Sequence, residues 1–213
     1  MISGLHVVTD DDVLGQKYFV EHATEILQSG IPDVFHLRGP YTSPKKLGEL
    51  VSKLLPTARS NETVFVINDR TDLALIHHLD GVHLGVRSLN PQKVREILGP
   101  SKIVGRSVHS VQEGLDMAKE GVDYLFLGSI FRTDSHPDIV PLGLEPLQVL
   151  SDQVRVPVIA IGGATSSSVT TLLKTGAKGV AVLRDIWGAP SPPEAVLSYE
   201  PKVNSTWSKI DGK

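Results

Sequence analysis

Residues 156–183 read VPVIAIGGATSSSVTTLLKTGAKGVAVL, and this stretch decides the fold. Residues 156–161 form an apolar run rich in β-branched side chains, long enough for a buried strand and too short for a helix. Gly162 and Gly163 allow a sharp turn, a helix to about Lys174 follows, and residues 180–183 are apolar again. This order predicts one parallel βαβ unit with a right-handed crossover.

The glycine turn also predicts an anion site. Glycines leave their backbone N–H groups open to a ligand, and a helix that starts beside them adds the positive end of its dipole. A tight turn without a ligand explains the same two residues, because a glycine pair carries less information than a full phosphate-binding motif. Both interpretations stay open.

The rest of the chain repeats the alternation of short apolar runs and amphipathic segments. The expected strands are 5–8, 33–38, 63–67, 81–84, 102–105, 124–127, 156–161 and 180–183. The expected helices are 15–28, 44–55, 71–78, 91–98, 111–119, 144–150 and a last one that is capped by Thr165 or one of residues 166–168 and runs to about 174. Eight such units in about 190 residues predict a compact (β/α)₈ TIM barrel, with a doubly wound open sheet as the alternative. We expect one domain over residues 1–213, with the barrel at about 4–187 and a C-terminal helix and polar tail at 188–213.

Composition narrows the possible functions. The chain has 213 residues, a net charge of −3 and no cysteine. Disulfides, thiolate catalysis and cysteine-ligated metals are therefore excluded, and a nucleic-acid partner is not expected. No apolar run reaches the length of a membrane span and no signal peptide is evident, so we expect a cytoplasmic protein without a membrane partner. Exposed barrel helices are compatible with a homodimer.

Polar residues follow the expected strands, and in a TIM barrel the loops after the strands gather at the face that holds the active site. Several of these loops carry a basic or imidazole group, which indicates a small anionic ligand. Arg38 suits bidentate binding of a carboxylate or phosphate. Asp69 suits a metal or a polar heterocycle, or else a cap for the helix that starts at Thr71. His83 lies in an apolar run and is expected to be buried and hydrogen-bonded. The substrate-binding candidates are His36, Arg38, Asn68, Asp69, Ser107 and Thr133.

Five motifs in order resemble the thiamine phosphate synthase superfamily, which includes the TenI-type thiazole tautomerases. They are INDR at 67–70, DGVHLG at 80–85, GRSVHS at 105–110, GVDYLFLGSIFRT at 121–133, and VPVIAIGG at 156–163 with GVAVL at 179–183. The resemblance implies a (β/α)₈ barrel. It also implies one of two activities: synthases join a pyrimidine pyrophosphate to a thiazole phosphate with Mg²⁺, whereas tautomerases move a proton on a carboxylated thiazole phosphate without a metal.

The chain departs from the synthase pattern at three positions. Pro40 replaces a lysine, Ser88 replaces the second metal aspartate, and His136 replaces a further lysine, whereas Asn68 and Asp69 are kept. These losses weaken a site that must stabilise a departing pyrophosphate. We therefore expect no metal ligands and no cofactor, with Mg²⁺ required only if the protein is a synthase.

GRSVHS and the His36-x-Arg38 pattern resemble the tautomerase branch instead. Ser129 occupies the position of the histidine that carries the proton in that branch. Another imidazole must then titrate near neutral pH, and we favour His136, in the long loop, over His109. The predicted catalytic set is thus His136, His109 and Ser129. The predicted phosphate site is Gly162, Gly163, Leu183 and Arg184, in which the arginine either binds the anion or pairs with Asp185.

Together these features predict a thiazole tautomerase-like enzyme of thiamine biosynthesis, with a small thiazole phosphate as its ligand. A thiamine phosphate synthase with an altered Mg²⁺ and pyrophosphate site is one alternative. A non-catalytic regulatory protein that binds a thiazole phosphate is the other, because a fold does not by itself determine chemistry.

Overall fold

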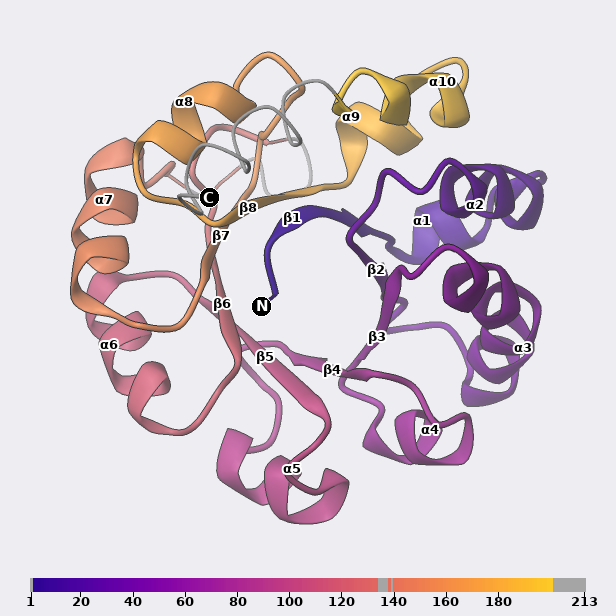
Figure 1. Ribbon diagram of the computed structural model, residues 1–213, viewed down its shortest axis with the longest axis horizontal. Helices are drawn as coiled ribbons and strands as arrows, with labels where there is room; N and C mark the ends of the chain where they lie inside the picture. The colour runs from indigo at the N-terminus through magenta and orange to yellow at the C-terminus, as the bar shows by residue number, and fades with distance from the viewer. Residues whose placement is uncertain (1, 134–137, 139, 201–213) are drawn as a thin grey trace.

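Eight parallel strands close into a barrel surrounded by helices (Figure 1). The computed structural model describes residues 2–133, 138 and 140–200. The strands are β1 Gly4–Val8, β2 Val34–Leu37, β3 Val64–Asn68, β4 Gly81–Leu84, β5 Ile103–Val108, β6 Tyr124–Leu127, β7 Val158–Ile161 and β8 Gly179–Val182. Each strand pairs with the next in the chain, and β8 pairs with β1. The closed ring confirms the predicted (β/α)₈ TIM barrel and excludes the open sheet.

The helices lie outside the ring of strands. They are α1 Asp11–Leu14, α2 Phe19–Gln28, α3 Pro44–Ser60, α4 Thr71–Ile76, α5 Pro91–Leu98, α6 Val111–Lys119, α7 Leu144–Gln153, α8 Val169–Lys174, α9 Arg184–Trp187 and α10 Pro192–Leu197. In the part of the chain that the structure describes, no helix is long and apolar enough to cross a membrane. Residues 201–213 of the expected polar tail lie outside the described residues.

Several helices differ from their predicted bounds, and two of the differences have an evident physical cause. The first predicted helix, 15–28, begins only at Phe19 as α2. The short α1 precedes the predicted range, and the side chain of Asp10 caps it by accepting a hydrogen bond from Val13 N. The second predicted helix, α3, passes through Pro56 instead of ending before it. Leu54 and Ala58, on either side of the proline, are both fully buried. Tertiary burial of this face therefore outweighs the local cost of an internal proline, about 3 kcal/mol.

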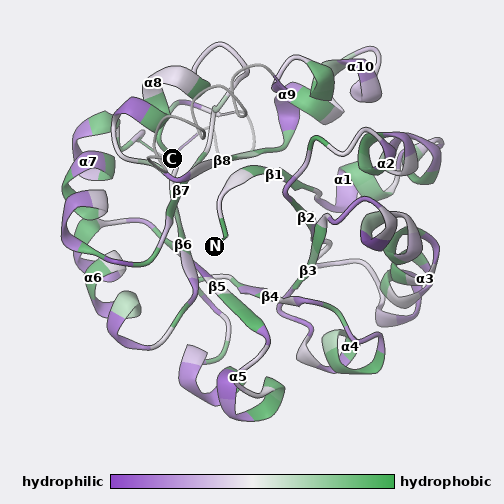
Figure 2. Ribbon diagram, in the orientation of Figure 1, coloured by the Kyte–Doolittle hydropathy of each residue, from purple (hydrophilic) through white to green (hydrophobic). Residues whose placement is uncertain are grey.

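The strands separate two layers of side chains. One set packs outward against the helices, and the other fills the interior of the barrel around Val8, Tyr124, Phe126, Ile159 and Ala181. In Figure 2 the helices carry hydrophobic and hydrophilic residues together, as expected for elements with one buried and one exposed face.

Three histidines lie in the interior layer, where His6, His36 and His83 are at most 2% exposed. His83 Nδ1 is 2.9 Å from the hydroxyl of Tyr124. His83 Nε2 is 2.8 Å from the hydroxyl of Ser107. The prediction of a buried, hydrogen-bonded His83 is confirmed. His36, by contrast, was expected at the substrate, and the structure places its ring inside the barrel with Nε2 2.9 Å from His6 Nδ1. Residues two apart on a strand point to the same side, so His36 and Arg38 share an orientation. They differ in depth, because Arg38 is one step nearer the open end of the barrel.

Burial keeps these imidazoles neutral. Burial lowers the pKa of His36 to about 3. Burial also lowers the pKa of His6 well below its usual value, helped by the charge that His36 and His83 would carry. Burial likewise lowers the pKa of His83, and Arg38 and Arg106 add to the effect. The interior is therefore a neutral polar layer beneath the loops that follow the strands.

Candidate active site

Asp69 connects the loops that follow β3 and β4. Its backbone N donates to the carbonyl of His83 at 3.0 Å, and its φ of 61° is unusual for a residue other than glycine. Its carboxylate Oδ1 accepts hydrogen bonds from the hydroxyl of Ser88 and from the backbone N of Gly85, the latter at 3.2 Å. The capping alternative for Asp69 is wrong, because the cap residue of α4 is Arg70. The carboxylate is turned toward the β4–α5 loop instead.

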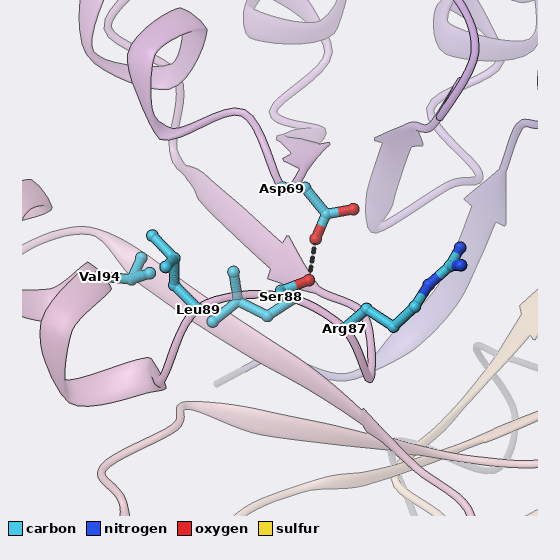
Figure 3. A pocket seen from close by; sticks show the side chains of 6 residues that line it. Asp69, Arg87, Ser88, Leu89 and Val94 are labelled. Carbon is cyan, nitrogen blue, oxygen red and sulfur yellow. Dashed lines mark hydrogen bonds between the residues drawn. The ribbon is translucent and has the colours of Figure 1, made fainter.

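A pocket of about 280 Å³ opens beside this carboxylate (Figure 3). The side chains of Leu84, Leu89 and Val94 provide apolar lining, while Asp69, Arg87 and Ser88 provide polar groups. In Figure 3 the Arg87 side chain extends away from Leu89 and Val94, and one Asp69 oxygen faces Ser88. One wall of the pocket is thus apolar and the other can hold charge.

Two arginines lie near this carboxylate and the buried histidines. The backbone N of Arg38 donates to the hydroxyl of Thr9 at 2.8 Å, which fixes the end of β2 against β1. Within the described ranges, no side chain pairs with its guanidinium, so Arg38 remains a candidate for anion binding. Arg106 donates to the carbonyls of Val86 at 3.1 Å and Leu89 at 3.4 Å. It therefore holds the loop that carries Ser88.

Sequence reasoning did not select Arg87 or Arg106. Burial lowers the pKa of Arg106, while the negative charges of Asp69 and Glu113 oppose this shift. The opposition places the Arg106 charge within electrostatic reach of the Asp69 carboxylate. An arginine in the middle of the otherwise uncharged strand segment IVGRSV was the signal available in the sequence.

The glycine turn after β7 packs tightly against the segment that follows β6. Gly162 and Gly163 have φ values of 92° and 67°. A Cβ on Gly162 would lie 2.6 Å from the Cβ of Ser129, and one on Gly163 would lie 2.7 Å from the Cβ of Phe131. Close packing is therefore sufficient reason for both glycines.

The helix after that turn begins at one of the predicted capping residues, Ser168, and α8 starts at Val169. It has only six residues, and four residues separate Gly163 from Ser168, among them Thr165, whose N donates to the hydroxyl of Ser168 at 3.0 Å. The helix therefore does not start directly at the glycines. Among the residues that the structure describes, none accepts a hydrogen bond from the N–H groups of Gly162 and Gly163. The backbone N–H groups of Gly162 and Gly163 therefore remain the candidate donors of the predicted phosphate site.

Arg184 pairs with a different loop from the one expected. Its guanidinium lies 3.0 Å from Asp10 and 3.3 Å from Asp12, both in the loop and helix that follow β1. Asp185, the expected partner, instead accepts hydrogen bonds from the hydroxyl of Tyr199 at 2.6 Å and from the backbone N of Ser166 at 3.2 Å. Leu183, directly after β8, is half-buried and precedes the short α9. The alternative that Arg184 pairs with Asp185 is wrong.

The predicted catalytic residues are partly brought together. The ring of His109 is held by a 2.5 Å hydrogen bond between Nδ1 and the carbonyl of Gly128, the residue before Ser129. Ser129 is 9% exposed, and its side chain is next to Gly162. Thr133 is half-buried. His136, the favoured proton carrier, lies outside the described residues.

The donor set tests whether Mg²⁺ fits this site. Within residues 2–133, 138 and 140–200, no three acidic or histidine side chains come together as a metal-binding group. Among the described residues that line the pocket, Asp69 is the only one with a carboxylate, and the Ser88 hydroxyl donates to one of its oxygens. Mg²⁺ is commonly held by one or two carboxylates together with phosphate oxygens of a substrate. Asp69 therefore fits an ion that arrives with a phosphate ligand.

Comparison with known proteins identifies the family. A family model described as thiamine monophosphate synthase matches residues 5–186. The chain belongs to this family. It is 37% identical to the thiamine-phosphate synthase of Chlorobium luteolum over 203 residues, covering 95% of this chain and 93% of the relative. It is 34% identical to that of Roseiflexus castenholzii, covering 90% and 84%.

A solved structure gives the same result. The thiamine phosphate pyrophosphorylase of Pyrococcus furiosus superposes with a TM-score of 0.85 at 33% identity, covering 95% of this chain and 96% of the other.

The predicted main function is therefore corrected. Curated relatives that are 34–37% identical over most of the chain are named thiamine-phosphate synthases, which overturns the tautomerase and favours the synthase alternative. The error has a physical cause, since the prediction weighed lost charged residues position by position. The structure shows that Asp69 lines a pocket together with Arg87, and that Arg106 lies within electrostatic reach of it; neither arginine was part of the prediction.

Proposed function

We propose that the protein is a thiamine-phosphate synthase, a transferase that moves a pyrimidine group from pyrophosphate to a thiazole phosphate and releases pyrophosphate. The observation that carries the proposal is the family relationship over nearly the whole chain, with relatives of that name at 34–37% identity. The reaction needs a site that stabilises a highly charged leaving group. The residues around Asp69 supply the elements of such a site.

Arg38 is the first of these elements. Its backbone is fixed by Thr9, and its guanidinium is available for a bidentate contact with phosphate oxygens. Asn68 Oδ1 is buried without a hydrogen-bond partner among the described residues, so it can accept from an amino group of a bound heterocycle. The apolar wall of Leu84, Leu89 and Val94 excludes water beside the charged groups. Lower local polarity strengthens each electrostatic contact there.

Mg²⁺, when bound with the substrate, would neutralise charge on the departing pyrophosphate, and Asp69 would hold it. Gly162 and Gly163 offer two backbone N–H groups for the phosphate of the thiazole. Neither N–H group has an acceptor in the part of the chain that the structure describes, which supports this assignment, and the close packing of the glycines requires the same residues.

The test is direct formation of thiamine phosphate. Purified protein is incubated with the pyrimidine pyrophosphate, the thiazole phosphate and Mg²⁺, and both thiamine phosphate and released pyrophosphate are measured. We expect equal amounts of the two products, with turnover in the ordinary enzymatic range of about 1 s⁻¹ or more. Reactions that lack either substrate are the controls. Absence of both products with fully folded protein would reject the proposal.

The variant Arg38→Gln tests the site assignment. Loss of a guanidinium that contacts the phosphates should lower kcat/KM by about 10²-fold. Arg155→Gln, near the N-terminal end of β7 and therefore at the opposite end of the barrel, is the matched control and should keep full activity.

A further inference from the structure

We propose that Ser88 makes divalent-cation binding at Asp69 depend on a co-bound diphosphate. The inference rests on the proposed function for its ligand and concerns which groups complete the site. Asp69 and Ser88 are joined by a hydrogen bond from the serine hydroxyl to Oδ1, and Gly85 N donates to the same oxygen. Two donors thus occupy the oxygen that would otherwise face a cation. Only Oδ2 remains for a metal.

The local charge leads to the same conclusion. The pocket lining holds one acidic side chain, Asp69, and one basic side chain, Arg87. Arg106 adds a second positive charge within electrostatic reach of Asp69. Glu113 adds a second negative charge near Arg106. Two acidic and two basic side chains leave the cation-free site without net negative charge, so a divalent ion that arrives alone gains little. Ligand charge count is a main determinant of affinity for hard cations.

A diphosphate reverses this balance. Its negative charges are attracted by the arginines, and its oxygens complete the octahedral shell that one carboxylate cannot provide. In this scheme the Ser88 hydroxyl orients Asp69 and does not bind the metal. Cation and diphosphate bind cooperatively, because each supplies what the other lacks. By linkage, each then raises the affinity for the other by the same factor.

The experiment is equilibrium dialysis of the whole protein with Mn²⁺, with and without inorganic pyrophosphate, at fixed free Mn²⁺. For the natural chain we expect weak binding of Mn²⁺ alone, and at least about tenfold tighter binding with pyrophosphate. Ser88→Asp removes the donor and adds a carboxylate. It should tighten binding of Mn²⁺ alone by about tenfold or more. Ser101→Asp, an exposed position at the opposite end of the barrel, controls for general surface charge and should change nothing.

Two further variants separate orientation from ligation. Ser88→Ala should keep Mn²⁺ affinity with pyrophosphate within about threefold, whereas Asp69→Asn should remove specific binding. Three outcomes overturn the inference: equal Mn²⁺ affinity with and without pyrophosphate, a Ser88→Asp variant that binds no tighter than the natural chain, or a Ser88→Ala variant as weak as Asp69→Asn. Each is independent of thiamine phosphate formation, so failure here is distinguishable from failure of the proposed function.

Discussion

His83 and Asp69 are joined by a 3.0 Å backbone hydrogen bond, yet their side chains lie in opposite environments. The imidazole of His83 is 2% exposed and bonded to Tyr124 and Ser107 inside the barrel. The carboxylate of Asp69 is at the mouth of a pocket and bonded to the β4–α5 loop. A polar residue within a strand near its end can therefore serve stability, whereas one just beyond the end of the neighbouring strand can serve ligand binding.

The interior and the mouth of the barrel differ in the free-energy cost of placing a charge on a side chain. In the interior, burial keeps His6, His36 and His83 neutral. At the mouth, the negative charges of Asp69 and Glu113 oppose the lowering of the Arg106 pKa by burial. The interior should therefore respond to changes in stability, and the mouth to changes in activity. Four experiments test that division, in order of decreasing effect.

Acidification should unfold the protein through its interior. A histidine whose pKa is lower in the folded state binds fewer protons there than in the unfolded chain. Its contribution to stability is complete above about pH 6.5 and is lost as pH falls toward the folded value, which for His36 is about 3. Each neutral histidine then costs about 1.4 kcal/mol per pH unit. Urea unfolding should therefore lose about 2 kcal/mol between pH 6.5 and pH 5 for His36 alone, and His6 and His83 should add losses of the same sign.

One substitution checks the origin of that slope. His36→Gln should reduce it by about a third, since one of three proton-linked groups is removed. His78→Gln changes an exposed histidine outside the barrel and should leave the slope unchanged. The charges of Arg38 and Arg106 also lower the pKa of His83. Because salt screens buried charges only weakly, added salt should change the contribution of His83 to the slope only slightly. A slope that is equal in His36→Gln and the natural chain would contradict the assignment.

Gly105→Ala should break the interior packing. A Cβ at this position would overlap the ring and hydroxyl of Tyr124. Overpacking of this kind costs about 3 kcal/mol or more in the free energy of unfolding. Gly85→Ala is the matched change at the mouth, where a Cβ would meet Ser88 Oγ at 3.6 Å, an ordinary contact. Urea denaturation should separate the two variants by at least about 2 kcal/mol, and equal stability would contradict the close packing.

Asp69→Asn should affect activity and leave stability nearly unchanged. The amide oxygen still accepts from Ser88 and Gly85, but the charge that would hold a cation is lost. Synthase kcat/KM should fall by about 10²-fold or more, which is about 2.7 kcal/mol in transition-state stabilisation. Asp72→Asn removes a half-exposed carboxylate that pairs with Arg70 and should keep full activity, because such surface pairs contribute little. Equal kinetics for the two variants would remove Asp69 from the site.

Tyr124→Phe should give the smallest change, again in the interior. It removes the hydroxyl bonded to His83 Nδ1 and leaves a buried imidazole nitrogen unpaired. The expected loss is about 1–3 kcal/mol of unfolding free energy, or a fall in Tm of about 2–4 °C per kcal/mol. Tyr18→Phe, at a tyrosine that is 49% exposed, is the control. A Tm unchanged in both variants would mean that the His83–Tyr124 bond contributes nothing.

The sequence by itself determined the architecture. Apolar runs of four to six residues, separated by amphipathic segments and closed by glycines, were sufficient to predict all eight strands and the parallel barrel. Strands β4 Gly81–Leu84 and β6 Tyr124–Leu127 have the predicted bounds. This success has a local cause, because the period of a strand and the capping of a helix depend on near neighbours.

Only the tertiary structure decided the role of each polar side chain. His36 and Arg38 are two residues apart, yet one is sealed inside the barrel and the other lies near its end. Asp69 meets Ser88, and Arg184 meets Asp10, across 19 and 174 positions of sequence, respectively. Burial and pairing across such distances set which groups are charged, and no local pattern encodes them. For that reason, position-by-position reading of lost charges led to the wrong activity while the fold was predicted correctly.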